Sequence, residues 1–159
     1  MASAAFLPPL VNCNGQWDQV LAGLYTVFVT DLKRHKSAHD GKGIMYDSRI
    51  GLDGKEEAFW HLVQKDDPAA GGRTFDPSRS EKLPWLRPTA ETADSSITVF
   101  DYDSGNSKKG VRRYLWIESS DYVVVLKHQK NVFFLITAYH VDAGGARKLS
   151  KHYRNRVTP

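Results

Sequence analysis

Four stretches in the second half of the chain alternate between apolar and polar residues, and only short polar links separate them. They cover residues 96–103, 111–119, 121–128 and 132–141. A period of two is typical of β-strands, and links this short join neighbouring antiparallel strands. The last two stretches are apolar on both faces, as expected for central strands that helices cover. The sequence therefore predicts four consecutive antiparallel strands.

The first half of the chain follows other patterns. Residues 14–36 carry apolar side chains at spacings of three and four, which predicts an amphipathic helix. The aromatic run "AFWHLVQK", residues 58–65, is short and bounded by polar loops, and we predict a strand there. Within residues 75–93, Asp76 followed by Pro77 marks a helix start, and later prolines predict short, broken helical turns.

Together these elements predict one domain of the α+β class, with an N-terminal helix packed on a mostly antiparallel sheet. We divide the 159 residues into an N-terminal arm (1–13), a central domain (14–145) and a basic C-terminal helix or tail (146–159). No stretch approaches the roughly 20 apolar residues that span a bilayer. The first residues do not resemble a secretory signal, so we expect a cytoplasmic protein that does not use a membrane.

The charge balance favours an anionic partner. The chain has 22 Lys and Arg against 18 Asp and Glu, which gives a formal net charge of +4. Residues 147–156 alone carry five Lys or Arg and no acidic residue. Such a segment is typical of RNA-binding proteins, and an exposed, solvated helix face is the simpler alternative.

Common signatures of metal, nucleotide and hydrolase sites are absent from the sequence. The chain has a single cysteine, and its six histidines do not have the spacing of a zinc site. It has no glycine-rich nucleotide-binding motif and no nucleophile elbow. We therefore expect no metal and no cofactor, which leaves a metal-free site as the remaining candidate.

Polar residues in apolar surroundings suggest where such a site lies. His61 sits inside the aromatic run, either as a packed histidine with a satisfied ring or as an imidazole held for chemistry. On the last strand, strict alternation places Thr137 and Tyr139 on the same face as Phe133 and Leu135. The two hydroxyls then either form part of a site or complete hydrogen bonds at the rim of the sheet.

Arg79 is a further candidate, in the stretch "DPSRSEKLPW". Its planar guanidinium suits a phosphate, because it can donate to two oxygens at once. A structural pair with Glu81, or a cap on a broken helix, explains the same residue equally well.

Four motifs also occur in a fixed order: "GQWDQVLAGLYTVFVTDL", "GKEEAFWHLVQK", "RTFDPSRSEKLPWLRP" and "YVVVLKHQKNVFFLITAYHV". As a set they resemble the phage-associated branch of the barnase–EndoU–colicin–RelE-like (BECR) nucleases, over residues 14–141. The resemblance implies a curved, mostly antiparallel sheet of four to five strands and a toxin-like, metal-independent ribonuclease. It implies catalytic residues at His61, Arg79, Thr137 and Tyr139.

The resemblance also implies a reaction and partners. The substrate is RNA, tRNA or another cellular RNA, and the partner is an immunity or antitoxin protein. Attack by the 2′-hydroxyl on phosphorus leaves a 2′,3′-cyclic phosphate, with His61 as base or acid and Arg79 on the phosphate. Thr137 donates to phosphate, and Tyr139 stacks on a base or donates a hydrogen bond. Two alternatives stay open: a non-catalytic RNA- or protein-binding domain, and a phage structural or host-takeover protein.

Overall fold

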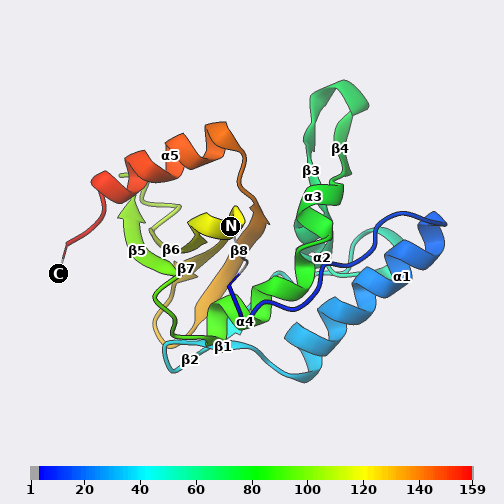
Figure 1. Ribbon diagram of the computed structural model, residues 1–159, viewed down its shortest axis with the longest axis horizontal. Coiled ribbons are helices and arrows are strands. Elements are labelled where there is room, and N and C mark those ends of the chain that lie inside the picture. Colours follow the sequence, from blue (N-terminus) through cyan, green and yellow to red (C-terminus); the bar gives the residue numbers. More distant parts are fainter. Residues whose placement is uncertain (1–3, 159) are drawn as a thin grey trace.

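A six-stranded sheet organises the protein, as the computed structural model shows for residues 4–158 (Figure 1). The strand order is β1-β2-β8-β7-β6-β5. Neighbours are antiparallel except β2 and β8, which are parallel. The strands are β1 (Ala38–His39), β2 (Lys42–Met45), β5 (Thr98–Asp103), β6 (Val111–Ile117), β7 (Tyr122–His128) and β8 (Phe133–His140).

The four predicted consecutive antiparallel strands are confirmed as β5 to β8. The sheet has six strands rather than four to five, because β1 and β2 form between residues 38 and 45, where we predicted no strand. His39 pairs with Lys42 across a two-residue turn, and Asp40 and Gly41 both have positive φ, 49° and 75°. Asp-Gly is a strong signal for such a hairpin turn. The sequence therefore contained this signal, and we missed it.

Helices cover both faces of the sheet (Figure 1). On one face α2 and α3 contact β8, α4 contacts β7, and α1 packs outside them on the turn Leu83–Trp85. On the other face lies α5. The helices are α1 (Trp17–Phe28), continued by a π-helix (Val29–Arg34), α2 (Glu57–Val63), α3 (Pro77–Ser80), α4 (Leu86–Glu91) and α5 (Ala143–Arg154); short 3-10 turns cover Leu52–Gly54, Pro68–Ala70, Leu83–Trp85 and Glu118–Ser120.

Two apolar clusters fill the spaces between these layers. The larger one joins α1, α2 and α4 to the sheet, and Leu24, Phe59 and Leu126 in it are fully buried. The smaller one lies under α5 and contains Trp116, Val125 and Leu149. Burial of a side chain of this size contributes about 1.5–3 kcal/mol, so both faces of β7 and β8 stabilise the fold.

The sheet is strongly curled. Arg113 of β6 donates to Asp101 of β5 (2.9 Å) and also reaches Asp40 in the β1–β2 turn (3.2 Å). The turn at Asp40 and strand β6 belong to opposite halves of the strand order, so only a curled sheet brings these two side chains together. The same guanidinium lies 5.4 Å from the centroid of the Phe133 ring. These contacts hold the two sides of a half-barrel to each other.

The predicted strand at residues 58–65 is wrong, because most of that run is helix α2. Five of the seven residues of α2 are buried, so the helix lacks the exposed polar face that reveals amphipathic periodicity. A short, continuously apolar run is compatible with a buried strand or with a buried helix. Only the last part of the run becomes strand, as β3 (Gln64–Asp67).

Strand β3 forms a two-stranded hairpin with β4 (Gly72–Phe75), separate from the main sheet. The hairpin extends away from the rest of the protein (Figure 1). Directly after it, the predicted helix start is confirmed: Asp76 accepts from the backbone N–H of Arg79, and Pro77 is the first residue of α3. The broken helical turns are confirmed as α3, the turn Leu83–Trp85 and α4.

The ends of the chain pack against this framework. In the N-terminal arm, Val11 N–H donates to the carbonyl of Glu81, and the carbonyl of Pro8 accepts from the Trp85 indole. Residues 1–3 of the arm, and residue 159, lie outside the described residues. The basic C-terminal segment is a helix, and that helix begins at Ala143. Among the described residues, no helix combines the length and the apolar character needed to cross a bilayer.

Helix α2 is anchored at its start by a buried carboxylate. Glu56 is the N-cap residue, and its side chain is 2% exposed. It accepts from the Tyr25 hydroxyl (2.6 Å) and pairs with Lys33 Nζ (2.9 Å). Burial alone raises the pKa of Glu56, but these two partners lower it by more, so the net pKa lies below its usual value. The pair therefore fixes α2 to the end of α1 as long as Glu56 is ionised.

We expect Glu56→Gln to lower the free energy of unfolding by about 2 kcal/mol at neutral pH, since hydrogen bonds to a charged group are lost. A folded-state pKa below the unfolded value means that the carboxylate stabilises the fold above the unfolded pKa, near 4.3, and loses this effect as pH falls through the folded value. The difference in the free energy of unfolding between wild type and variant should therefore shrink below about pH 4. Urea unfolding at several pH values measures it, and a difference independent of pH would contradict the assignment.

Candidate functional site

His61 lies near the C-terminal end of α2, next to the base of the β3–β4 hairpin. Its side chain is partly exposed and borders a cavity of about 220 Å³, which is also lined by Phe134 to Ile136 of β8. The imidazole is therefore not a packed core histidine with a satisfied ring. It reaches the surface beside the last strand of the sheet.

Arg73 of β4 is the cation closest to this imidazole. Its Nη1 lies 3.5 Å from His61 Nε2, and because an arginine only donates, Nε2 presents its lone pair to it. Burial and then the positive charge of Arg73 lower the pKa of His61 below its ordinary value. His61 is accordingly neutral near pH 7, which is the form that accepts a proton.

Arg73 itself has weak ionic compensation. Its nearest acidic partner is Asp66, with 3.8 Å between Arg73 Nε and Asp66 Oδ1, and the Asp66 side chain is 92% exposed. At this distance, an ion pair with so exposed a carboxylate contributes little and is screened by salt. The guanidinium thus remains free to bind an anion beside His61.

Arg79 occupies a different environment. Its Nη1 donates to the backbone carbonyls of His61 (2.8 Å) and Gln64 (2.7 Å), at the end of α2. The neighbouring Ser80 hydroxyl donates to the carbonyl of Val63 (3.1 Å). The last carbonyls of a helix have no hydrogen-bond donor within the helix, and here side chains of α3 supply the donors. Arg79 is therefore close to His61 but bonds to its backbone, not to its imidazole.

Strand β8 contains a bulge that changes which side chains share a face. Val125 pairs with Thr137 and Leu126 pairs with Leu135, so Ile136 is an extra residue on β8. Before the bulge Leu135 packs in the larger cluster; after it, Tyr139 packs in the smaller one. The expected common face of Phe133, Leu135, Thr137 and Tyr139 is therefore wrong, since the extra residue shifts the alternation by one.

Thr137 and Tyr139 do share a face with each other, the one that α5 covers. They pair with Val125 and Val123, both in the smaller cluster, and paired residues project to the same side. The Tyr139 ring lies 5.6 Å from the Arg79 guanidinium carbon, which joins this face to the α2 side. Burial raises the pKa of Tyr139, so the phenol keeps its proton and can donate a hydrogen bond.

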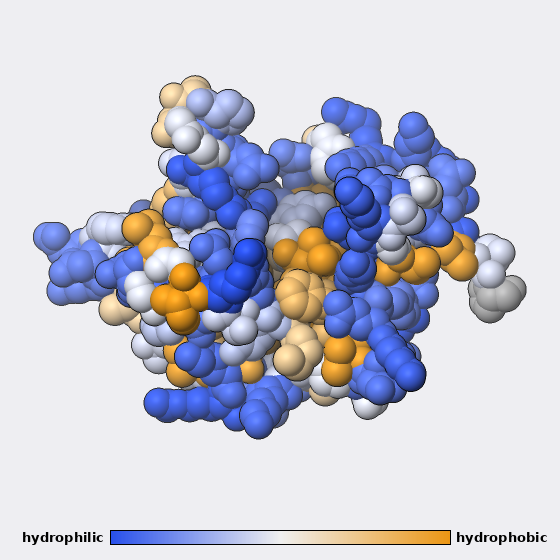
Figure 2. All heavy atoms as spheres, turned by 180° about the vertical axis from the view of Figure 1, so that it is seen from behind, coloured by the Kyte–Doolittle hydropathy of each residue, from blue (hydrophilic) through white to orange (hydrophobic). Residues whose placement is uncertain are grey.

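Three of the four predicted site residues are thus directly connected: His61 to Arg79 through a backbone carbonyl, and Arg79 to Tyr139 through the ring. Thr137 stands two residues from Tyr139 on the same strand, about 7 Å away. The surface is hollowed between the β3–β4 hairpin and α5, and hydrophilic residues form both rims (Figure 2). The candidate site is this cleft between the hairpin and α5. His61 lies on its α2 side, whereas Thr137 and Tyr139 lie on the face of β8 under α5, so the predicted site residues are divided between the two faces of the sheet.

Sequence reasoning did not assign Arg73 a role. The signal available was the turn: the proline and glycines of "DDPAAGG" mark a short connection that can reverse the chain and return it to the end of α2. The sequence alone does not predict that Arg73 lies close to His61. Among residues 4–158, no group of three or more His, Cys, Asp or Glu side chains is arranged to hold a metal ion.

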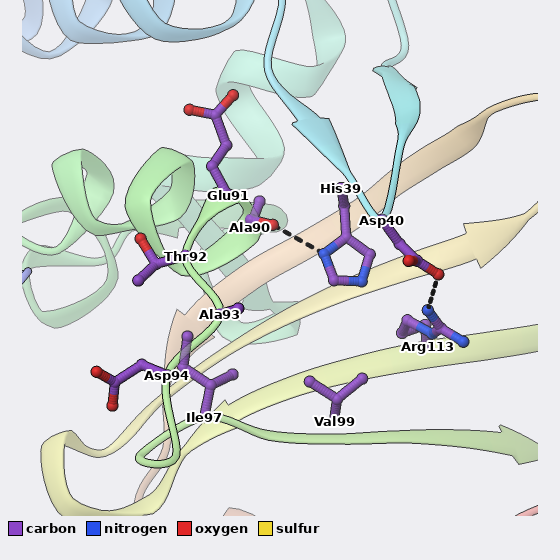
Figure 3. Close-up of a pocket in the computed structure, with 10 residues that line it drawn as sticks. All are labelled: His39, Asp40, Ala90, Glu91, Thr92, Ala93, Asp94, Ile97, Val99 and Arg113. Carbon is purple, nitrogen blue, oxygen red and sulfur yellow. Dashed lines mark hydrogen bonds and ion pairs between the residues drawn. The ribbon is translucent and has the colours of Figure 1, made fainter.

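A second cavity, of about 420 Å³, lies at the opposite edge of the larger cluster, between the β1–β2 turn and β5–β6 (Figure 3). His39 projects into it, and its Nδ1 lies 2.8 Å from the Ala90 carbonyl. Burial lowers the pKa of His39, and its Nε2 is covered and has no partner among the described residues. Arg113 is occupied by Asp40 and Asp101. The cationic side chain of this cavity is therefore already paired with carboxylates, and its contacts close the curled sheet.

No family model matches this chain, and comparisons with curated proteins and with solved structures find no match either. The geometry of the cleft and the motifs of the sequence are therefore the basis of the functional argument.

Proposed function

We propose that the protein is a metal-independent endoribonuclease of the toxin-like BECR type, with the active site in the cleft around His61. One observation carries the proposal: a neutral imidazole and an arginine with little ionic compensation lie 3.5 Å apart on the rim of a cleft. Metal-free RNA cleavage needs a base for the 2′-hydroxyl and positive charge on the phosphate, and this pair supplies both.

In the proposed reaction the 2′-oxygen attacks phosphorus while its proton passes to His61 Nε2. The bond from phosphorus to the 5′-oxygen breaks, and that oxygen takes a proton from water at the open side of the cleft; the hydroxide that remains takes up the proton that His61 then releases. No water is consumed in this step, and the products carry a 2′,3′-cyclic phosphate and a 5′-hydroxyl. Arg73 turns from His61 to the phosphate oxygens as the substrate binds, which frees Nε2 to act as the base.

The other predicted site residues have supporting roles in this proposal. Arg79 fixes the end of α2, and its positive charge adds to the field at the cleft. Tyr139 donates to phosphate or stacks on a base, since its raised pKa opposes proton transfer. Thr137 offers a hydroxyl on the same face of β8. A nuclease of cytoplasmic RNA, such as tRNA, also requires control, so an immunity or antitoxin protein that covers the cleft is part of the proposal.

A non-catalytic RNA-binding domain is the second candidate. The observation that favours it is that Arg79 Nη1 donates to two backbone carbonyls. Arg73 is then the arginine next to His61 that is available for a phosphate, so the cleft has one cation fewer for catalysis than the sequence predicts. A domain of this kind binds the same RNA through the same cleft and leaves it intact.

The purified protein, incubated with total tRNA in EDTA, should cut the RNA into fragments that end in 2′,3′-cyclic phosphates and begin with 5′-hydroxyls. DNA of matching sequence should resist, since it lacks the nucleophile. Analysis of both product ends identifies the reaction, and protein without His61 controls for contaminating nucleases. Dependence on added metal would refute the mechanism, and binding without cleavage of any RNA would establish the second candidate.

A further inference from the structure

Helix α5 has two distinct faces. Leu149 is buried at 1% exposure, and Ala146 packs beside it on the sheet. The opposite face carries charged side chains at helical spacing, since Arg147, Lys151 and Arg154 are separated by four and three residues. The exposed cations of this segment are Arg147, Lys148, Lys151, Arg154 and Arg156.

These five cations form no ion pair with any other residue among 4–158, and no acidic residue occurs between Ala143 and Arg156. Elsewhere Arg49, Arg87 and Arg113 pair with carboxylates, whereas other cations have no ion pair among the described residues either. What distinguishes this segment is that five such cations follow one another within ten residues, with no acidic residue between them. The outer face of α5 is thus a stripe of uncompensated positive charge. Such a stripe attracts polyanions.

The stripe begins beside the candidate site. Ala146, one residue before Arg147, packs in the same cluster as Tyr139, and Tyr139 lies under Arg79. From Arg147 to Arg154 the helix rises about 10 Å. Helix α5 forms one side of the hollow seen in Figure 2, and the hairpin with Arg73 forms the other. A strand that enters the cleft can therefore continue along α5, where it meets the cations of this helix.

We infer that the outer face of α5, with its cations Arg147, Lys148, Lys151 and Arg154 and with Arg156 just beyond its end, is a docking surface for the phosphate backbone of the RNA that the cleft acts on. The inference rests on the proposed function and adds to it where the substrate is held. An anionic membrane fits this face less well. Helices that bind membrane surfaces insert an apolar face, and the apolar face of α5 already covers the sheet.

The test compares two triple variants, both made in the His61→Ala protein so that RNA is bound and not cut. The first is Arg147→Gln, Lys151→Gln and Arg154→Gln. The matched control removes three exposed cations away from α5: Arg34→Gln, Lys108→Gln and Lys130→Gln. Fluorescence anisotropy with a labelled single-stranded RNA measures affinity at several salt concentrations, and thermal melts confirm that both variants fold.

The α5 triple should reduce the slope of log K against log[salt] by about 2, because each phosphate contact to a single strand contributes roughly 0.7. The control triple should change the slope by much less. Equal slopes in the two triples would overturn the inference, as would α5-dependent binding to anionic vesicles without binding to RNA. Cleavage is measured separately, on protein that retains His61. If that protein does not cleave RNA, the binding measurement still tests the role of α5.

Discussion

His61→Ala should lower the rate of RNA cleavage by roughly 10² to 10⁴, since it removes the proposed general base. The fold should survive, because the His61 side chain is partly exposed and lines a cavity. Initial rates on one defined RNA measure the effect, and thermal melting checks the fold. His35→Ala is a suitable control, since His35 is exposed and pairs with Glu91 outside the cleft.

The pH dependence of the wild-type rate provides a second measurement of the same assignment. A general base must be unprotonated, so the rate rises with pH and levels off above the pKa of His61. Because burial and Arg73 lower that pKa, the midpoint of the rise should lie below the ordinary histidine value of about 6.5. Full activity in His61→Ala, or a midpoint well above 6.5, would show that another group takes the proton.

Local rules explain which parts of the fold the sequence predicted. Strands β5 to β8 alternate with a period of two and are joined by short links, so each strand and its neighbour can be identified without tertiary information. Helix α3 was predicted from Asp76 and Pro77. The Asp76 side chain caps the helix and the Pro77 ring fixes φ at its first residue, and neither effect depends on what packs against the helix. In both cases the determining interaction lies within a few residues of the chain.

Helix α2 shows where local rules fail. Its short run is buried on nearly all sides, and periodicity needs an exposed face to be visible. What holds it as a helix lies elsewhere: Tyr25 and Lys33 fix its start through Glu56, and Arg79 and Ser80 satisfy its last carbonyls. These partners are 15 or more residues distant, and residues 58–65 alone do not reveal them.

The bulge at Ile136 had the larger consequence for the site. It turns Thr137 and Tyr139 to the face under α5, and nothing in the composition of β8 marks the extra residue. Even so, Tyr139 meets Arg79, because the edge of β8 beyond its short pairing with β2 is covered by α2 and α3. The candidate residues were therefore identified from sequence motifs, while their faces and contacts depend on the register of the sheet.

The two arginines near His61 should respond differently to the same substitution. Arg73→Met removes the proposed phosphate ligand, and loss of one such donor typically slows catalysis by about 10² to 10³. It should barely alter stability, because the only acidic partner of Arg73 among the described residues, Asp66, is exposed. It should also move the midpoint of the pH–rate profile upward, since one of the charges that lowers the pKa of His61 is gone.

Arg79→Met should instead lower the free energy of unfolding by about 2 to 3 kcal/mol, because it leaves the carbonyls of His61 and Gln64 at the end of α2 without their donor. Arg79→Lys separates the two roles, since an ammonium can donate to both carbonyls but cannot form a planar fork on phosphate. Urea unfolding and cleavage rates on all three variants give the comparison. If Arg79→Lys restores stability and most of the activity, Arg79 is a positioning residue and Arg73 is the phosphate ligand. If it restores stability alone, the guanidinium of Arg79 contacts the phosphate as well, and the cleft uses two arginines.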